Sequence, residues 1–292
     1  MDTARDKRTL KRVDAEELWL ITSVDQDGYI CIGCRLKATP CSYNRVKKNQ
    51  KRPYFRFNHQ DGHEAGCFYE QDEKLAKEAK KQKISTPEGF PLSHPSVLDL
   101  TDVKLIEEKG SVKSAEEGQR IYSKSDGSPS NTSRKHNYSV KTINSIAKHY
   151  LKFPYDRKEM SLAIIGISGS NYSEVIKKLP DKIVKFQQKK MRYGRLYNYN
   201  NTKVIDSKII VNLLDGCWVN NKRQNTYKVV INTTGWNQSK KDYILNCVSA
   251  SQNEYKEDKR KGTFVFFIGI QNESNLSEFI VNDYRLFSCI SY

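Results

Sequence analysis

The chain has 292 residues, with 50 Lys and Arg against 34 Asp and Glu, which gives a formal net charge of +16. A charge of this sign attracts polyanions, and nucleic acid is the commonest polyanion of the cytoplasm. The alternative to a nucleic-acid partner is that the positive charge only reflects the codon bias of an AT-rich genome. No apolar run reaches the ~18 residues that a membrane-spanning helix needs, and the charged start has no apolar segment behind it. We therefore expect a cytoplasmic protein of about two domains, with no membrane partner.

Four residues near the start have the spacing of a metal site. Cys31 and Cys34 form a C-x2-C pair, and His63 and Cys67 form an H-x3-C pair. Thiolate and imidazole groups at these spacings are ligands of tetrahedral zinc, and four protein ligands leave no open position for water or substrate. The predicted cofactor is therefore a structural Zn2+, which would stabilise a small domain that lacks a large core of its own.

Other assignments of the ligands stay open at this point. His59 lies four residues before His63, and Cys41 lies in a Thr-Pro-Cys-Ser loop that could turn toward the ion. The cysteines could also be unrelated thiols, because cysteine often behaves as a small buried hydrophobic residue. Their distribution argues against this, since four of the seven lie in the first quarter of the chain and the other three are scattered through apolar segments.

The first 70 residues predict a β-ribbon. Residues 17–24 are β-rich, a turn signal follows, and residues 29–34 return as a second strand that carries the first two cysteines. Residues 54–57 form the strand that leads to His63.

The runs at 29–34, 52–57 and 63–67 resemble the zinc ribbon that opens competence-protein-CoiA-like bacterial proteins. The resemblance is confined to residues 15–70. It implies a zinc module in front of a nuclease or another DNA-handling domain, in a bacterial or mobile-element protein that acts in phage defence or in DNA uptake and transfer. The acidic and lysine residues of that family's nuclease core have no counterpart downstream, so the resemblance does not extend to catalysis.

Composition then divides the rest of the chain. Residues 70–83 combine acidic residues first, basic residues last and strong helix formers, which predicts an exposed helix. The stretch that follows is rich in Pro, Gly and Ser and cannot bury enough apolar surface to offset its chain entropy. We therefore expect a zinc-ribbon domain with its helix at 1–83, a flexible linker at 84–137 and an α+β domain at 138–292.

The C-terminal domain shows an ordered series of elements. A helix at 138–151, a short buried strand at 160–167 and a helix at 172–178 come first. They are followed by β-rich runs at 192–204, 208–219 and 226–235, a helix at 238–255, and runs at 263–271 and 278–290. Five strands with one helix between the third and the fourth follow the order of an OB-fold, so an OB-like five-stranded barrel is predicted at 190–292.

The first of these runs predicts a nucleic-acid surface. In a strand, Tyr193, Arg195, Tyr197 and Tyr199 would share one face. Bases stack on aromatic rings at about 1–3 kcal/mol each while cations neutralise phosphates, so we expect a single-stranded nucleic acid as partner, with DNA favoured. The alternative is that the tyrosines pack as core. Further residues expected on the surface are Lys189, Lys190, Arg192, Trp218 and Trp236.

Catalysis is not expected. No pair of carboxylates with a lysine has the D-x(n)-[DE]-x-K pattern of a magnesium-dependent nuclease, and neither G-x-S-x-G nor H-E-x-x-H occurs. The acids considered are Asp206, Asp215, Asp242 and Asp283. Two alternatives to a nucleic-acid-binding protein are kept: a metal-dependent nuclease, and an adaptor whose ribbon and barrel both bind a protein partner.

Overall fold

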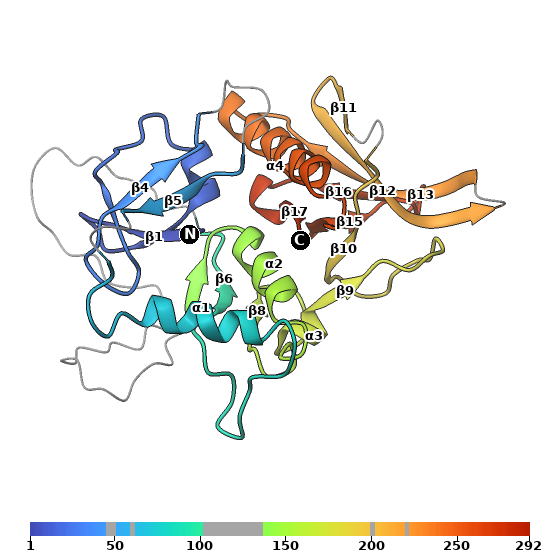
Figure 1. Cartoon of the computed structure of the whole chain (residues 1–292). Helices are drawn as coiled ribbons and strands as arrows, with labels where there is room; N and C mark the ends of the chain where they lie inside the picture. Colours follow the sequence, from blue (N-terminus) through green and yellow to red (C-terminus); the bar gives the residue numbers. More distant parts are fainter. Residues whose placement is uncertain (45–50, 59–61, 102–136, 199–201, 220–221) are drawn as a thin grey trace, which may run out of the picture.

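The computed structural model describes residues 1–44, 51–58, 62–101, 137–198, 202–219 and 222–292. Within these ranges the protein is a mixed α+β structure, mostly strands, with four α-helices (Figure 1). None of these helices combines the length and the apolar character that crossing a bilayer requires.

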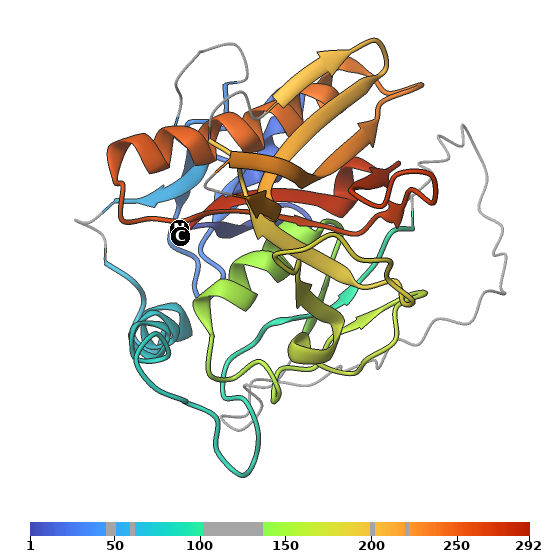
Figure 2. The ribbon, with the colours of Figure 1, turned by 90° about the vertical axis from the view of Figure 1, so that its right-hand side faces the viewer.

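A four-stranded sheet forms the centre of the molecule. It consists of β9 (Ile176–Lys178), β10 (Met191–Arg195), β14 (Thr263–Phe267) and β17 (Phe287–Ser291), in the order β17-β14-β10-β9. Helix α2 (Ile143–Lys152) covers one face and helix α4 (Gln238–Glu257) the other, as Figure 2 shows. Strand β14 lies between the two helices, and its alternate side chains enter two different apolar clusters.

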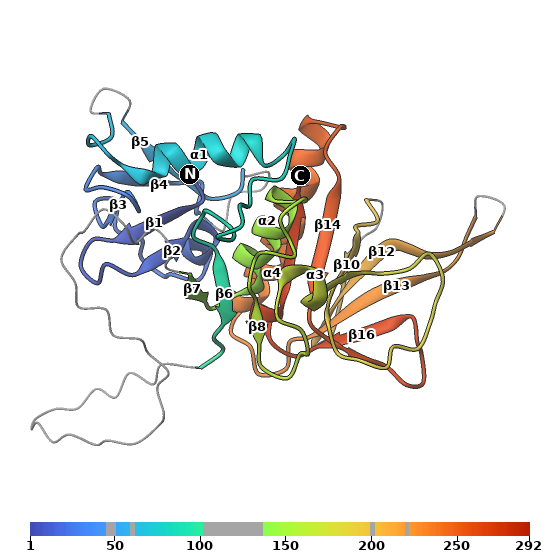
Figure 3. The same ribbon diagram turned by 90° about the horizontal axis from the view of Figure 1, so that it is seen from below.

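A five-stranded sheet packs against the same apolar cluster as α4, here called the cluster beneath α4. Its order is β11-β12-β13-β16-β15, with strands β11 (Thr202–Ile205), β12 (Lys208–Val219), β13 (Lys222–Asn232), β15 (Ile270–Gln271) and β16 (Glu278–Val281). Strands β12 and β13 project away from the N-terminal part of the chain (Figure 3). A bridge between Leu196 and Leu213 links this sheet to the central one.

The predicted OB-like barrel is not closed. Three of the five predicted runs divide between the two sheets, so that β10 and β11, β14 and β15, and β16 and β17 each separate. The division after β14 occurs at Gly269, where a Cβ atom would lie 2.9 Å from the carbonyl oxygen of Ile280. Local alternation identifies a β-rich run but does not show where the chain leaves one sheet for another, and this is why the prediction failed.

The N-terminal part is built from short strands. Strands β1 (Thr3–Asp6), β2 (Arg12–Asp14) and β3 (Tyr29–Ile30) form one sheet, β4 (Ala38–Cys41) pairs with β5 (Tyr54–Phe57), and α1 (Phe68–Glu78) follows. The predicted strand at 17–24 is wrong. A 3-10 helix at Ala15–Trp19 occupies its start, and it places Trp19 against Tyr243 of α4, with ring centroids 6.2 Å apart.

The predicted linker differs from the structure in its first part. Residues 84–101 contain β6 (Pro95–Leu98), which pairs in parallel with β7 (Tyr138–Val140) and β8 (Ala163–Ile164). The buried carboxylate of Asp156 also accepts hydrogen bonds from the backbone N–H groups of Ile84 and Ser85. The remainder of the predicted linker, 102–136, lies outside the described residues.

Two predicted helices are shorter than expected because part of each predicted range pairs as a strand. Residues 138–140 pair with β6, so α2 begins at Ile143 and not at residue 138. Helix α3 (Tyr172–Val175) ends where the chain becomes β9, whose parallel pairing with β10 competes with further helix. Helix α4 lies where the sequence predicts it, and α1 overlaps its predicted range but ends at Glu78, five residues before the predicted end.

A buried group of charges joins the N-terminal part, which contains β1–β5 and α1, to the rest of the protein, here called the body. Arg52, whose side chain is 11% exposed, forms ion pairs with Glu16 at 3.4 Å and with Glu254 of α4 at 3.2 Å. Its guanidinium also donates to Ser251 Oγ and to the carbonyl oxygen of Cys289. Lys148 of α2 lies 2.5 Å from the same carboxylate of Glu16. The predicted N-terminal and C-terminal domains are thus held together by buried contacts far apart in the sequence.

Replacing Arg52 by alanine should lower the free energy of unfolding by about 3 kcal/mol or more, because two carboxylates would lose a buried cation. Chemical denaturation at neutral pH measures the change. Arg56→Ala is the matched control, since Arg56 is an exposed arginine of β5 and its loss should change stability by about 0.5 kcal/mol or less. Equal effects of the two substitutions would contradict the role given to Arg52.

Candidate metal centre

The two halves of the predicted metal site come from different elements. Cys31 directly follows β3 and Cys34 lies three residues further, while His63 and Cys67 immediately precede α1. Gly33 lies between the halves, where a Cβ atom would be 2.7 Å from Cys67 Sγ. Because no side chain fits in that space, glycine is required at this position for the two halves to meet.

The ligand atoms have the spacing of a tetrahedral shell. Zinc bonds of about 2.3 Å to sulfur and about 2.0–2.1 Å to nitrogen place two sulfurs about 3.8 Å apart and a sulfur and a nitrogen about 3.5 Å apart. Cys31 Sγ and Cys67 Sγ are 3.9 Å apart, and His63 Nδ1 is 3.4 Å from Cys34 Sγ and 3.5 Å from Cys67 Sγ. All four ligand atoms lie within 4.8 Å of one another, so they are close enough to bind one metal ion.

The thiols differ in how readily they lose a proton. Burial raises the pKa of Cys31 to about 12. Burial opposes ionisation of Cys34 as well, but hydrogen bonds from His63 and from nearby backbone N–H groups lower its pKa to about 7. The Gly33 N–H also donates to Cys31 Sγ at 3.3 Å, which would stabilise a thiolate there. A metal ion binds thiolates and deprotonates them as it binds, so this backbone environment suits metal ligation.

Aromatic rings fix the orientation of His63. The ring of Phe57 on β5 packs edge-to-face on the imidazole at 4.5 Å, and the ring of Tyr69 on α1 lies 5.5 Å away. Cys31 and Cys67 are buried, whereas Cys34 and His63 are partly exposed. Four protein ligands, held by packing on two elements, leave no ligand position free for a substrate.

Cys41, the alternative ligand with a described position, is not part of this cluster in the structure. Cys41 ends β4, and its thiol donates to the carbonyl oxygen of Thr39 at 3.6 Å. His59 lies outside the described residues. Among the residues with described positions, the Cys31, Cys34, His63 and Cys67 cluster is the one group of three or more Cys, His, Asp and Glu side chains able to hold a metal ion.

The tyrosines predicted to stack on bases are less available than expected. Tyr193 is stacked on Phe266 with centroids 5.0 Å apart, and its hydroxyl accepts a hydrogen bond from Tyr150 in the cluster beneath α2. Tyr197 is partly buried and its N–H donates to the carbonyl oxygen of Asn212, while Tyr199 lies outside the described residues. Tyr193 therefore packs against the core, as the alternative expects, because α2 covers it, whereas Arg195 on the same strand stays exposed.

The other predicted residues fall on three elements. Arg195 is exposed at the end of β10, and Trp218 on β12 is 41% exposed with its ring N–H donating to Leu214. Trp236, before α4, packs edge-to-face on Tyr284 at 6.0 Å. The predicted cations that precede or lie on β10 share one segment: Lys189, Lys190, Arg192 and Arg195.

The run of basic residues around the start of β10 extends further along the chain than the residues predicted from the tyrosine pattern. Residues 177–195, here called the basic segment, contain eight basic residues and one acidic residue, a net charge of +7. Five of its lysines are exposed, namely Lys177, Lys178, Lys182, Lys185 and Lys189. The charge run is visible in the sequence, but the residues that hold it in place, Phe186 and Gln271, carry no sequence signal of that role.

Comparisons with protein-family models, with curated proteins and with solved structures found no match. The resemblance of residues 15–70 to CoiA-like zinc ribbons therefore stays a prediction. The geometry of the cluster and of the basic segment must carry the functional argument.

Replacing Cys34 by serine should abolish stoichiometric metal binding, because it removes a ligand atom of the cluster. Elemental analysis of the purified protein measures metal per chain. Cys41→Ser is the matched control and should keep the wild-type metal content, since Cys41 Sγ lies outside the cluster. Retention of metal by the first variant and loss by the second would reverse the assignment of ligands.

Proposed function

We propose that this protein binds nucleic acid through the basic segment and contains a structural zinc centre. The observation that carries the proposal is the placement of five exposed lysines on a backbone held in one conformation by the body of the protein. The segment contributes +7 of the formal net charge of +16, although it is a short part of the chain. Clustered cations of this kind are the electrostatic signature of a phosphate-binding surface.

Hydrogen bonds hold the middle of the basic segment against the five-stranded sheet. The hydroxyl of Tyr227 accepts from the N–H of Val184 at 3.1 Å and donates to the carbonyl oxygen of Lys182 at 2.8 Å. Gln271 of β15 uses both ends of its amide, accepting from the N–H of Phe186 and donating to the carbonyl oxygen of Val184.

Packing completes this attachment. Ile183 and Phe186 pack against the cluster beneath α4, so that Lys182 and Lys185 are left exposed beside them. A surface that is already ordered loses less conformational entropy when it binds a ligand. The segment therefore supports binding better than its charge alone would.

Zinc is the ion that best suits the metal centre. Three thiolates and one imidazole are the ligands of a common type of structural zinc site, and the three separations given above agree with zinc bond lengths. The centre connects β3 with α1 in a part of the chain that has only a small apolar cluster of its own. Zinc would therefore stabilise the N-terminal part and take no part in chemistry.

The preferred ligand in this proposal is single-stranded DNA. A flexible single strand can follow an irregular chain segment, and an exposed ring such as that of Trp218 can stack on a base. The CoiA-like ribbon supports a bacterial or mobile-element setting such as phage defence or DNA uptake. An adaptor for a protein partner is the second candidate, favoured by the exposed apolar residues Val204 and Ile205 on the edge strand β11.

The affinity for a single-stranded oligonucleotide should fall steeply with salt, because bound cations release counterions from the phosphates. Replacing Lys182, Lys185 and Lys189 together by glutamine should reduce the slope of log K against log salt by about 2, at about 0.7 per phosphate contact in single strands. Fluorescence anisotropy at several salt concentrations measures the slope, and duplex DNA and RNA of the same sequence test the preference.

The matched control replaces Lys7, Arg8 and Lys11 by glutamine. These residues are also exposed, and their loss changes the net charge by the same amount. The control should keep the wild-type slope. Equal losses in both triple variants would show that only net charge matters, and a flat salt dependence of the wild type would favour the protein adaptor.

A further inference from the structure

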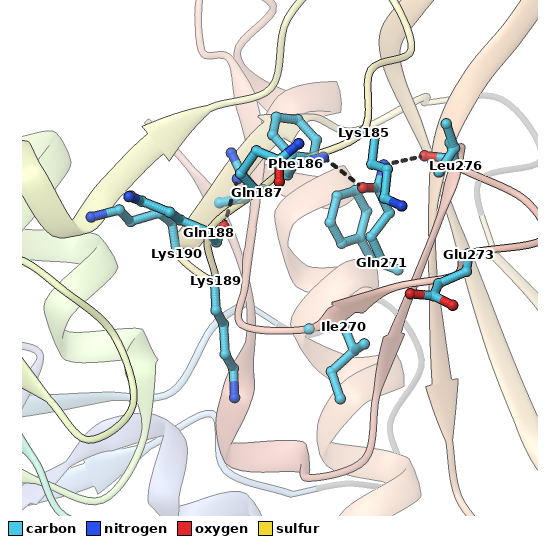
Figure 4. A pocket seen from close by; sticks show the side chains of 13 residues that line it. Lys185, Phe186, Gln187, Gln188, Lys189, Lys190, Ile270, Gln271, Glu273 and Leu276 are labelled. Carbon is cyan, nitrogen blue, oxygen red and sulfur yellow. Dashed lines mark hydrogen bonds between the residues drawn. The ribbon is translucent and has the colours of Figure 1, made fainter.

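A pocket of about 230 Å³ lies between the basic segment and the turn from β14 into β15 (Figure 4). Its walls include Phe186, Gln188 and Arg192 on one side, and Gly269, Ile270 and Gln271 on the other. Ile270 is 62% exposed at its mouth, so the pocket opens to solvent. Pockets for drug-sized ligands usually measure about 300–1,000 Å³, so this one suits a smaller group.

Arg192 is a buried cation in the wall of this pocket. It is only 7% exposed, and its guanidinium carbon lies 3.4 Å from the centre of the Phe186 ring. One nitrogen, Nη2, donates to the carbonyl oxygen of Gln188 at 3.1 Å. Burial lowers the pKa of Arg192 to about 10, which still leaves the group charged at neutral pH.

No carboxylate in the described part of the chain pairs with Arg192. Two arginines whose side chains are 11% and 13% exposed, Arg52 and Arg285, differ from it in this respect. Arg52 is paired with Glu16 and Glu254, and Arg285 is paired with Asp283 at 2.7 Å. A buried cation without an anion is costly, and an anionic ligand would remove that cost.

The charges around the pocket are mainly positive. Figure 4 shows Lys189 and Lys190 on one side, with Lys185 and the single acidic residue, Glu273, on the other. Lys190 donates to the carbonyl oxygen of Ser168, whereas Lys185 and Lys189 are exposed. The field in the pocket therefore favours an anion.

We infer that this pocket binds a phosphate group, with Arg192 as its buried cation and Lys185 and Lys189 at its rim. The inference deepens the proposed function and rests on it for the source of the phosphate, which would be one phosphodiester of a bound single strand. A guanidinium provides several N–H donors in a fixed plane, an arrangement that suits phosphate oxygens. A free phosphate ion would use the same contacts.

The first test uses the full-length protein and inorganic phosphate alone. Thermal unfolding in phosphate should show a higher midpoint than in chloride at equal ionic strength and pH, because only the native pocket binds the ion. Arg192→Met should abolish this difference. Without phosphate it should unfold at the wild-type temperature or higher, since it removes an unpaired buried charge and keeps a long side chain over Phe186.

The second test measures the affinity for a single-stranded oligonucleotide. Arg192→Met should weaken binding about tenfold or more, as expected for losing hydrogen bonds to a charged group. Arg260→Gln is the control, because it also removes one positive charge but from an exposed residue that precedes β14. Inorganic phosphate should compete with the oligonucleotide for the wild type.

The outcomes separate the two proposals. If the wild type binds the oligonucleotide and Arg192→Met binds it equally well, the pocket assignment is overturned while the proposed function stands. If phosphate stabilises the wild type but no oligonucleotide binds, the pocket is a phosphate site and the proposed function fails. An equal effect of phosphate on the wild type and on Arg192→Met, or no effect on either, overturns the inference.

Discussion

The buried carboxylate of Glu16 is the point on which the assembly of this chain depends. It is 1% exposed and lies between two cations, Arg52 from the N-terminal part and Lys148 from α2. A carboxylate buried at this depth is stable only when such partners are present. The 3-10 helix that carries Glu16, the segment that carries Arg52 and helix α2 must therefore come together as one unit. Arg52 then extends the contact to Glu254 of α4, so the small N-terminal part is stabilised by the rest of the protein. A metal ion held by Cys31, Cys34, His63 and Cys67 would stabilise it further.

The sequence predicts best the features that short spacings determine. The metal ligands lie in two pairs, each within five residues of chain, so their spacing reports on geometry that forms locally. Helix α4 also lies where the sequence predicts it, because its helical pattern does not depend on distant contacts. Residues 15–19 show the opposite case, since Trp19 is drawn into contact with Tyr243 and the local β-rich composition is overridden.

The remaining differences have one common cause, which is that strand pairing is decided over long distances. Alternation places Tyr193 and Arg195 on one face, but it cannot show that α2 covers Tyr193 and leaves Arg195 exposed. Likewise, residues 84–101 have the composition of a linker, yet β6 pairs with two strands that lie later in the chain. The nucleic-acid surface expected on the tyrosines is for this reason better sought on the basic segment.

The basic segment and the metal centre each depend on an irregular stretch of backbone that must be held in one conformation, and different kinds of bond would do this. The metal centre and residues 179–190 of the basic segment lie outside the helices and strands, so each needs bonds other than a regular backbone ladder to hold one conformation. In the metal centre these bonds would be those to an ion, whereas in the basic segment they are the hydrogen bonds of Gln271 and Tyr227. A repulsive run of lysines can be kept in place only if such bonds outweigh the repulsion between its charges. An anion between Arg192 and the rim lysines would reduce that repulsion further, so ligand binding and the order of this segment should reinforce each other.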